Sequence, residues 1–302
     1  MDLAALRARL PPHPRTRFAP SPTGWLHLGH IVNAIYVWGI ARALEGRIVL
    51  RIEDHDRERS RPAFERGILE DLAWLGLEAD EGARADTRIR QSDRLPAYEH
   101  ALARIDRVGL VYACRCTRRE IEQTAGDGSE LRYPGTCRSR QWPRGDGTGL
   151  RVRLDAGEES FEDAVHGLQT QSPADQCGDA LIRDRVGQWT YQWAVTVDDM
   201  EHGIDLVIRG DDLLASTGRQ IRMARLLGRQ SPPVFLHQPL LYGAPGVKLS
   251  KANRDAGIRE LRASGMSAPD VLGLAAARAG LLNAQKALRP DDLPTLFSRR
   301  WC

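Results

Sequence analysis

The sequence has 302 residues, of which 42% are apolar and 27% charged, and its formal net charge is +3. This length suits one large domain or two modest ones, and the composition is that of a water-soluble globular protein. No run of about 18 apolar residues is present, and the N-terminus has no apolar core of signal-peptide length, so we expect a cytoplasmic protein without a membrane span. A net charge this small permits a local basic face but does not demonstrate a nucleic-acid partner.

The first part of the chain predicts one βαβ unit. Residues 15–19 are an expected strand, which ends in a turn rich in proline and glycine. Residues 29–45 are apolar almost all round, as in a buried helix. Gly46 is expected to end this helix, and residues 47–53 to form a second strand with a β-branched middle. Strand, glycine turn, helix and strand in this order predict a parallel sheet.

The later elements are weaker in pattern. Helices are expected over 62–75 and 95–108, short strands over 150–185, a buried strand over 206–209, and a helix from its cap at Ser216 to Leu227. That last helix places Arg219, Arg222 and Arg225 on one face, which we expect to be solvated rather than in contact with RNA. Residues 110–150 hold three cysteines and many glycines and prolines, which indicates an inserted, irregular module.

These elements predict an α/β protein with a Rossmann-like, doubly wound parallel sheet. We expect the catalytic domain in two halves, at 1–109 and 186–255. Between them, residues 110–185 are an expected α/β insertion that carries the cysteine cluster and binds zinc, on the acceptor side. Residues 256–302 are an expected short helical tail.

The turn at residues 20–30 has the parts needed to hold ATP. Gly24 and Gly29 let the backbone approach a ligand closely, and the helix that opens at Gly29 and His30 directs its first amide groups at a phosphate. His27 and His30 are three residues apart and can donate to phosphate oxygens as charge develops on them. The alternative is two surface histidines in a proline-rich loop, which the order of strand, turn and buried helix disfavours.

A pair of lysines complements this turn. Only three of the 43 basic residues are lysine, and two of them, Lys248 and Lys251, lie within four positions. Their amines are compact point charges that can reach the β- and γ-phosphates and stabilise pyrophosphate as it leaves. The chain has no Gly-x-x-x-x-Gly-Lys motif, which disfavours a P-loop kinase or GTPase. The combination suits attack at the α-phosphate, and so nucleotidyl transfer to a carboxylate.

These two strings resemble the HIGH and KMSKS elements of class I aminoacyl-tRNA synthetases. His27-Leu-Gly-His30 matches the first and Lys248-Leu-Ser-Lys251 the second. The resemblance implies that these histidines and lysines are catalytic, and that His27, Gly29, His30 and Lys251 bind ATP with magnesium. Residues 17–24, 51–54 and 208–213, with Tyr191, resemble the glutamyl branch, and the similarity runs from about residue 15 to 255.

The chain is shorter than ordinary glutamyl-tRNA synthetases, which continue into a helical anticodon-binding domain. About 47 residues follow the lysine loop. This length and the cysteine cluster resemble the glutamyl-Q tRNA(Asp) synthetase family. That resemblance implies tRNA-independent activation of L-glutamate and its transfer to the queuosine base in the anticodon loop of tRNA(Asp). We expect a monomer.

Three other interpretations of the function remain open. The first is an adenylating enzyme of the same fold with a small-molecule acceptor. The second is transfer of glutamate to the 3′ end of a tRNA. The third is a paralogue without catalysis that only binds RNA.

A glutamate pocket needs cations for two carboxylates and an anion for the ammonium group. Arg17 and Arg209 each end an expected strand, where ligands of α/β sheets bind, and an arginine fork grips a carboxylate through two hydrogen bonds. Such a fork predicts poor acceptance of glutamine. Glu53 is the expected ammonium partner; the alternatives are a charged strand end or a metal site with the acidic residues that follow it.

Hydroxyl groups complete the expected pocket. Ser21 and Tyr191 supply them, although Tyr191 could also be a core residue. The resemblance implies the same positions for glutamate binding, and adds Phe18, Ala19 and Pro20.

The cysteine cluster predicts a zinc site. Cys114, Cys116 and Cys137 are three suitable thiolate ligands, and no histidine lies between residues 101 and 165. The resemblance implies Tyr133 as the fourth ligand. Three free thiols in a loop are the alternative. A zinc ion here, one per chain, would be structural, because the glycine- and proline-rich module has little core of its own.

Overall fold

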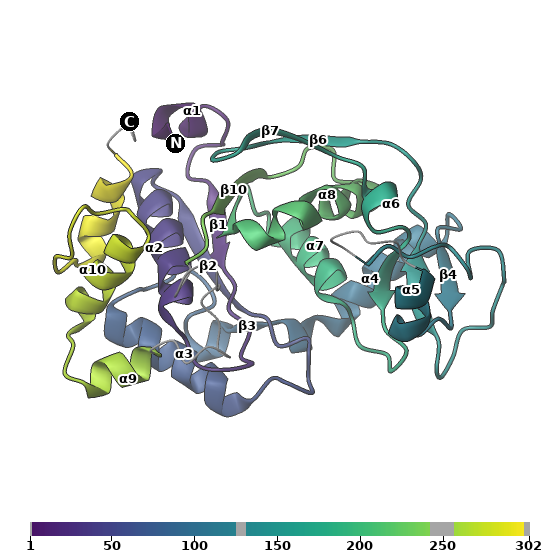
Figure 1. Cartoon of the computed structure of the whole chain (residues 1–302), viewed down its shortest axis with the longest axis horizontal. Helices are drawn as coiled ribbons and strands as arrows, with labels where there is room; N and C mark the ends of the chain where they lie inside the picture. Colours follow the sequence, from purple (N-terminus) through teal and green to yellow (C-terminus); the bar gives the residue numbers. More distant parts are fainter. Residues whose placement is uncertain (1, 125–130, 242–256, 299–302) are drawn as a thin grey trace.

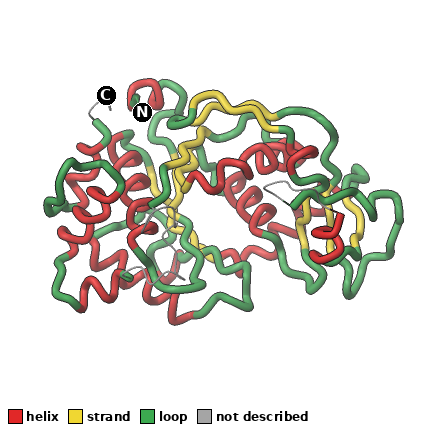
Figure 2. The backbone as a smooth tube through the Cα atoms, viewed as in Figure 1, coloured by secondary structure: helices red, strands yellow, loops and turns green. Residues whose placement is uncertain are grey.

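Helices cover both faces of one long sheet, and a smaller sheet stands apart at one end of the molecule (Figures 1 and 2). The computed structural model describes residues 2–124, 131–241 and 257–298, so the predicted lysines Lys248 and Lys251 lie outside the described residues. Within those ranges, no helix is long and apolar enough to cross a membrane.

Among the described residues, the main sheet has seven strands. They are β1 (Arg15–Phe18), β2 (Arg47–Ile52), β3 (Ile89–Arg90), β6 (Glu159–Asp163), β7 (Gly167–Gln171), β9 (Leu206–Gly210) and β10 (Val234–Gln238). Their spatial order is β3-β2-β1-β9-β10-β6-β7. Neighbouring strands are parallel except for β6 and β7, which form an antiparallel hairpin. The predicted parallel, Rossmann-like sheet is confirmed.

The helices are α1 (Leu3–Arg7), α2 (Leu28–Ala43), α3 (Pro62–Leu75), α4 (Leu95–Asp106), α5 (Arg118–Thr124), α6 (Pro173–Gln176), α7 (Tyr191–Glu201), α8 (Thr217–Leu226), α9 (Ile258–Ala263) and α10 (Ala268–Arg278), followed by a 3-10 segment over Pro290–Leu296. Helices α2, α3, α4 and α8 fall close to their expected positions, whereas α1, α5, α6 and α7 were not predicted. The tail is not a loose appendage, because Phe297 packs its ring on Tyr36 of α2 with ring centroids 5.1 Å apart.

Successive side chains of β2 point alternately to the two faces of the sheet. Ile48, Leu50 and Ile52 belong to the core that includes α2 and α10. Val49 belongs to the opposite core, with residues of β9, β10 and α8. Because side chains alternate along a strand, Arg51 faces the same side as Val49. A fully buried arginine therefore sits where the pattern calls for an apolar residue.

The end of α2 differs in detail from the expectation. Glu45, not Gly46, adopts the left-handed conformation, with φ of 56°. Gly46 is required for another reason, since a Cβ atom there would overlap the carbonyl oxygen of Pro14. The glycine therefore allows the chain to pass close to the segment before β1.

The inserted module is built on a three-stranded antiparallel sheet. Its strands are β4 (Val111–Cys114), β5 (Gly149–Val152) and β8 (Ala180–Arg183), in the order β4-β5-β8. The β6–β7 hairpin lies in the same stretch of sequence but joins the main sheet, where Asp163 pairs with Phe235 of β10. The expected module at 110–185 therefore contains a hairpin that belongs to the main sheet.

The arginine face of α8 is partly packed against β6. Arg222 and Arg225 both donate from Nε to the buried carboxylate of Glu159, the first residue of β6. The Arg222 side chain is only 15% exposed, whereas that of Arg225 is 42% exposed. The expectation of a solvated face is therefore wrong for Arg222 and right for Arg225, because periodicity shows which residues share a face but not which strand covers it. Ser216 precedes α8 as predicted, but its hydroxyl accepts from Gln192 Nε2 and makes no cap hydrogen bond.

Candidate active site

A cavity of about 820 Å³ opens at the carboxyl ends of β1, β9 and β10. Segments far apart in sequence line it, which is where open α/β sheets bind ligands. The predicted site residues that line the cavity are Arg17, Ala19, Ser21, His27, Gly29, His30, Glu53, Tyr191 and Arg209. The histidine turn and the two arginines, predicted from separate arguments, thus share one wall.

Phe18 and Pro20 do not line this cavity. The Phe18 ring packs edge-on against Trp38 of α2, with ring centroids 5.2 Å apart. The Pro20 carbonyl accepts from the Glu53 backbone N–H at 3.0 Å. These two residues fix the path of the chain between Arg17 and Ser21.

Two histidines cap the start of α2. The Gly29 N–H donates to Nδ1 of His27, and the His27 N–H donates to Nδ1 of His30, each at 3.1 Å. An Nδ1 atom that accepts carries no proton, so each neutral ring has its proton on Nε2. The cap therefore gives each histidine an N–H donor at Nε2, beside the positive end of the helix dipole.

Arg17 lies at the end of β1 and is compensated by an acid. Its Nε donates to both oxygens of Asp199 at 3.2 Å, and its Nη1 donates to the Ile208 carbonyl at 3.1 Å. Asp199 comes from α7, so the arginine joins the sheet to the helix layer. Burial opposes ionisation of the Asp199 carboxyl, but the Arg17 and Arg51 charges hold its pKa below the usual value.

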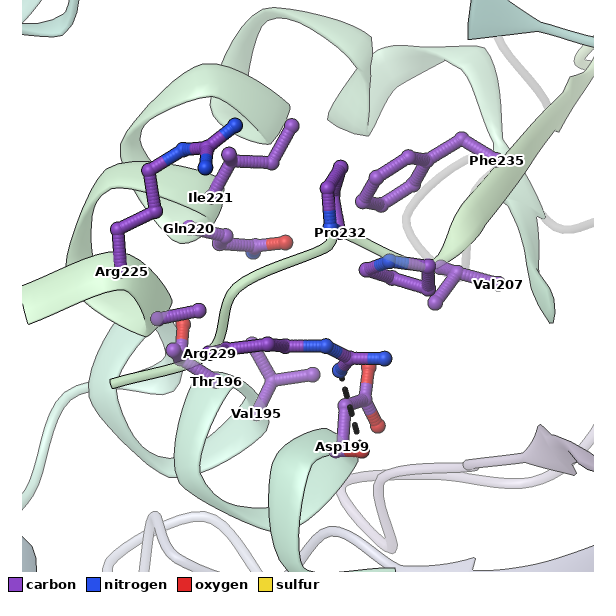
Figure 3. Close-up of a pocket in the computed structure, with 12 residues that line it drawn as sticks. Val195, Thr196, Asp199, Val207, Gln220, Ile221, Arg225, Arg229, Pro232 and Phe235 are labelled. Carbon is purple, nitrogen blue, oxygen red and sulfur yellow. Dashed lines mark hydrogen bonds between the residues drawn. The ribbon is translucent and has the colours of Figure 1, made fainter. Parts of the chain in front are cut away.

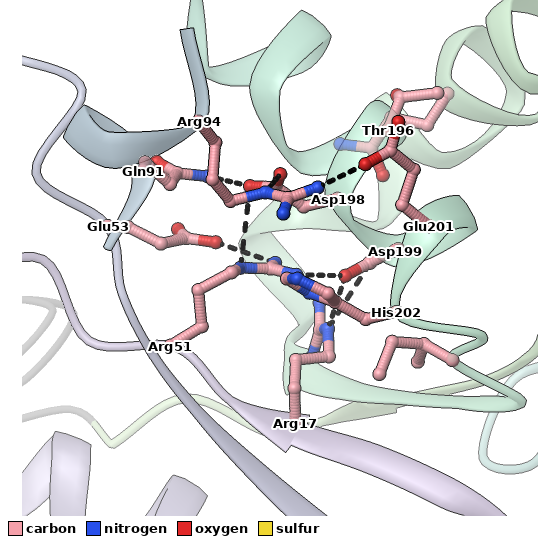
Figure 4. Close-up of polar contacts among 12 residues, drawn as sticks. Arg17, Arg51, Glu53, Gln91, Arg94, Thr196, Asp198, Asp199, Glu201 and His202 are labelled. Atoms are coloured by element: carbon pink, nitrogen blue, oxygen red, sulfur yellow. Dashed lines mark hydrogen bonds and ion pairs between the residues drawn. The ribbon is translucent and has the colours of Figure 1, made fainter. Parts of the chain in front are cut away.

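Behind the cavity wall lies a buried network centred on Arg51 (Figure 4). Arg51 donates to Glu53 Oε1 at 2.9 Å and to Asp199 Oδ1 at 2.8 Å. Its Nε lies 3.7 Å from the buried Asp198 carboxylate. The network ties Glu53, the proposed ammonium partner, to the acid that holds Arg17. In the sequence, Arg51 stands in a motif of the glutamyl branch but is not predicted as a site residue. Its one signal is a positive charge in an otherwise apolar strand.

Tyr191 is the first residue of α7 and lines the cavity. Burial raises the pKa of its phenol, and the charge of Glu53 adds to this. The hydroxyl therefore stays protonated and can donate to a ligand. This placement favours the binding role over the alternative of a core residue.

Arg209 differs from Arg17 in its partners. It donates to three neutral side chains, with Nε 2.9 Å from His237 Nε2, Nη1 2.7 Å from Gln220 Oε1, and Nη2 2.9 Å from Thr217 Oγ1. Among the described residues, no carboxylate lies within ion-pair distance of it. Burial lowers the pKa of its guanidinium. A buried cation without a counter-ion attracts an anionic ligand.

A second cavity lies between α7, α8 and the ends of β9 and β10 (Figure 3). Its volume is about 30 Å³, room for water but not for a substrate. Arg229 crosses its wall, with Nη1 3.5 Å from the Asp199 carbonyl. This space belongs to the packing behind the active site.

The predicted metal ligands meet in the module. The Sγ atoms of Cys114, Cys116 and Cys137 all lie within 4.8 Å of one another, and those of Cys116 and Cys137 are 3.6 Å apart. Ligands at about 2.3 Å around a tetrahedral ion have sulfurs about 3.8 Å apart, so this cluster can hold a metal ion. The Tyr133 hydroxyl is 3.4 Å from Cys114 Sγ and 3.9 Å from Cys116 Sγ.

Residues 14–277 match the family model described as tRNA synthetases class I (E and Q), catalytic domain. The chain belongs to this family. The resemblance seen in the histidine and lysine motifs is thereby confirmed.

Two relatives of similar length carry the same name. The glutamyl-Q tRNA(Asp) synthetase of Nitratidesulfovibrio vulgaris is 39% identical, over 94% of this chain and 92% of that protein. The protein of the same name from Symbiobacterium thermophilum is 40% identical, over 93% and 91%. Glutamate–tRNA ligase 1 of Acidithiobacillus ferrooxidans is 41% identical over 85% of this chain, which spans only 55% of that protein.

A solved structure shows the same arrangement. The glutamate tRNA ligase from Elizabethkingia meningosepticum, in complex with its amino acid, superposes with a TM-score of 0.77 at 25% identity. The match covers 95% of this chain and 65% of that one, so this chain spans less than two thirds of the ligase.

Proposed function

We propose that this chain activates L-glutamate with ATP, without tRNA, and transfers the glutamyl group to the queuosine base in the anticodon loop of tRNA(Asp). One observation carries the activation step: a single cavity joins the histidine-capped start of α2 to Arg17, Arg209 and Glu53. The full-length similarity to proteins named glutamyl-Q tRNA(Asp) synthetase supports the choice of acceptor.

The glutamate position follows from the charges in the cavity. Arg209, whose described partners are neutral, is proposed to bind one carboxylate through its fork. Arg17 is proposed to contact glutamate beside its ion pair with Asp199. Glu53 takes the ammonium group, Ser21 and Tyr191 supply hydroxyls, and the chain at residues 18–20 supplies backbone groups.

The ATP position follows from α2. The Nε2–H groups of His27 and His30, with the first amides of the helix, are proposed to donate to the phosphates. A glutamate carboxylate oxygen attacks the α-phosphorus, the bond from that phosphorus to the bridging oxygen breaks, and pyrophosphate leaves. Lys248 and Lys251 are proposed to stabilise the leaving group. Magnesium bound to ATP would neutralise part of the phosphate charge.

We further propose that the cluster in the module binds one structural zinc ion. Cys114, Cys116 and Cys137 supply thiolates, and the Tyr133 phenol is the fourth ligand. Arg151 holds the ring in place, with its Cζ 3.6 Å above the centre of the Tyr133 ring. Burial raises the pKa of the Tyr133 phenol, so a phenolate there would depend on the charge of the metal. A monomer is proposed as the active form.

The test is amino-acid-dependent exchange between ATP and pyrophosphate in the absence of tRNA. Exchange is expected with glutamate and not with glutamine or aspartate. The Lys251→Ala variant should lose exchange while keeping its affinity for tRNA. No exchange, or a preference for another acid, would overturn the proposed activation and favour an RNA-binding protein or another adenylating enzyme.

A further inference from the structure

Three buried polar side chains lie side by side at the carboxyl ends of three neighbouring strands. Arg209 of β9 and His237 of β10 are register partners, and Asp163 ends β6, the next strand across. All three are almost completely buried. Arg209 lines the active-site cavity, whereas His237 and Asp163 lie behind it. Neither of the latter two was predicted from the sequence as a site residue.

The hydrogen bonds fix the protonation of the histidine. Arg209 Nε donates to His237 Nε2 at 2.9 Å, and His237 Nδ1 lies 2.7 Å from Asp163 Oδ2. A guanidinium can only donate, so Nε2 must be the acceptor and the ring proton must be on Nδ1. The proton is then donated to Asp163. This tautomer is the opposite of the one found at His27 and His30.

Asp163 is built to remain an acceptor. Besides the histidine ring, its carboxylate accepts from the backbone N–H groups of Val165, His166 and His237 at 2.9, 2.9 and 3.1 Å. Burial opposes its ionisation, but these hydrogen bonds and the histidine hold its pKa below the usual value. Asp163 therefore stays ionised and selects the Nδ1–H form of the ring.

The surroundings of His237, burial above all, favour its neutral form. Burial lowers the pKa of the ring, and the positive charge of Arg209 and the nearby His166 act in the same direction, against Asp163. Thr217 Oγ1 lies 3.2 Å from Nε2, and the Phe235 ring stacks nearby with its centroid 5.9 Å away. A proton on His237 Nε2 would point at the Arg209 Nε–H and prevent this hydrogen bond. Only the neutral ring with its proton on Nδ1 can therefore accept from Arg209.

We propose that Asp163 and His237 act as a positioning pair that orients the Arg209 guanidinium toward the glutamate carboxylate without neutralising its charge. This role rests on the proposed function. A carboxylate in place of His237 would fix Arg209 as firmly, but it would compensate the charge as Asp199 does for Arg17. A neutral acceptor, held in one tautomer by a remote acid, supplies orientation and leaves the positive charge for the substrate.

Two variants of His237 test separately its hydrogen bond to Asp163 and the hydrogen bond that it accepts from Arg209. In His237→Asn, the side-chain amide occupies the place of Nδ1 and can still donate to Asp163, but Arg209 Nε loses its acceptor. In His237→Gln, the longer side chain places an acceptor near the position of Nε2. Both are measured by pyrophosphate exchange as a function of glutamate and of ATP, after thermal unfolding has shown that they are folded.

We expect His237→Asn to raise the KM for glutamate about tenfold, as for one lost charged hydrogen bond, and to leave the KM for ATP nearly unchanged. His237→Gln should restore the KM for glutamate to within a few-fold of the unmodified enzyme. Equal effects of the two variants, or an equal rise in the KM for ATP, would overturn the positioning role.

Nitrogen NMR of the unmodified protein, labelled at histidine, tests the pair independently of activity and of variant folding. The His237 signals should show a protonated Nδ1 and an unprotonated Nε2. The opposite tautomer would overturn the proposal even if glutamate is activated. Absence of glutamate-dependent exchange with the predicted tautomer present would instead overturn the proposed function, and with it the role of the pair in binding glutamate.

Discussion

Arg51 Nη1 lies 2.8 Å from Asp199 Oδ1, and the same carboxylate accepts from Arg17 through both of its oxygens. One acid from α7 therefore holds two arginines from adjacent strands, of which only Arg17 lines the cavity. Arg51 also binds Glu53. Arg51 lies behind the cavity wall, but through Asp199 and Glu53 it helps to fix the positions of Arg17 and Glu53 in that wall.

Replacing Asp199 by Asn should destabilise the fold and weaken glutamate binding together. The change leaves two buried guanidinium groups without their shared charge, a situation that costs about 3 kcal/mol or more. Urea unfolding measures the loss, and the KM for glutamate should rise in the same variant. Asp86→Asn is the matched control, because Asp86 and its partner Arg84 are both exposed, and it should change neither quantity. A stability of Asp199→Asn equal to that of the control would contradict the network.

Replacing His27 by Asn should separate helix capping from catalysis. Asparagine can accept from the Gly29 N–H and so keep the cap, but it lacks the Nε2–H donor. We expect exchange to slow about 100-fold with unchanged thermal stability, whereas His27→Ala should also lose about 1 kcal/mol of stability. If His27→Asn exchanges at the normal rate, the donor role of this ring is wrong.

Asp71 should make the protein less stable as the pH rises from 4 to 6. It is buried in α3, and burial raises its pKa to about 6 despite the charges of Arg259 and Arg262. The folded form thus binds this proton more tightly than the unfolded form, so the contribution of Asp71 to stability is most favourable below pH 4 and falls as the carboxyl ionises. Asp71→Asn should gain about 3 kcal/mol at pH 7.5 and little at pH 4. Urea unfolding at pH 4 and pH 7.5 measures the free energy of unfolding of both proteins. A gain in stability that is the same at both pH values would refute the effect of burial on Asp71.

Removal of metal should affect the module more than the cavity. Purified protein is expected to contain one zinc ion per chain by elemental analysis, and Cys137→Ser should lose most of it. Because the ligands lie in the separate β4-β5-β8 region, glutamate-dependent exchange should persist after chelation while the module loses protection from proteolysis. Cys177→Ser is the control, since Cys177 is buried outside the cluster. Equal zinc loss in both variants would contradict the proposed ligands.

The parts predicted well from sequence are those set by local pattern. The unit β1-α2-β2 follows from an apolar helix between two short strands, and α3 begins and ends where expected, with Pro62 at its start and Gly76 in the left-handed conformation after it. Arg17 and Arg209 were found because strand ends are where such sheets bind ligands, and the family resemblance pointed to the same residues.

The parts that sequence did not reveal depend on contacts between distant segments. Arg51 and Asp199 are 148 positions apart, and His237 and Asp163 are 74 apart. No local spacing signals such pairs. In the same way, the hairpin β6–β7 reads as part of the module, but its pairing with β10 is decided by tertiary contact. A buried charge in an apolar strand was the one usable hint, at Arg51.

Mass mapping of labelled glutamate on digested tRNA(Asp) tests the proposed transfer most directly. We predict label on the queuosine nucleoside of the anticodon loop, and none on the same tRNA prepared without queuosine. Label on the 3′-terminal adenosine, or equal labelling of both tRNA preparations, would contradict it.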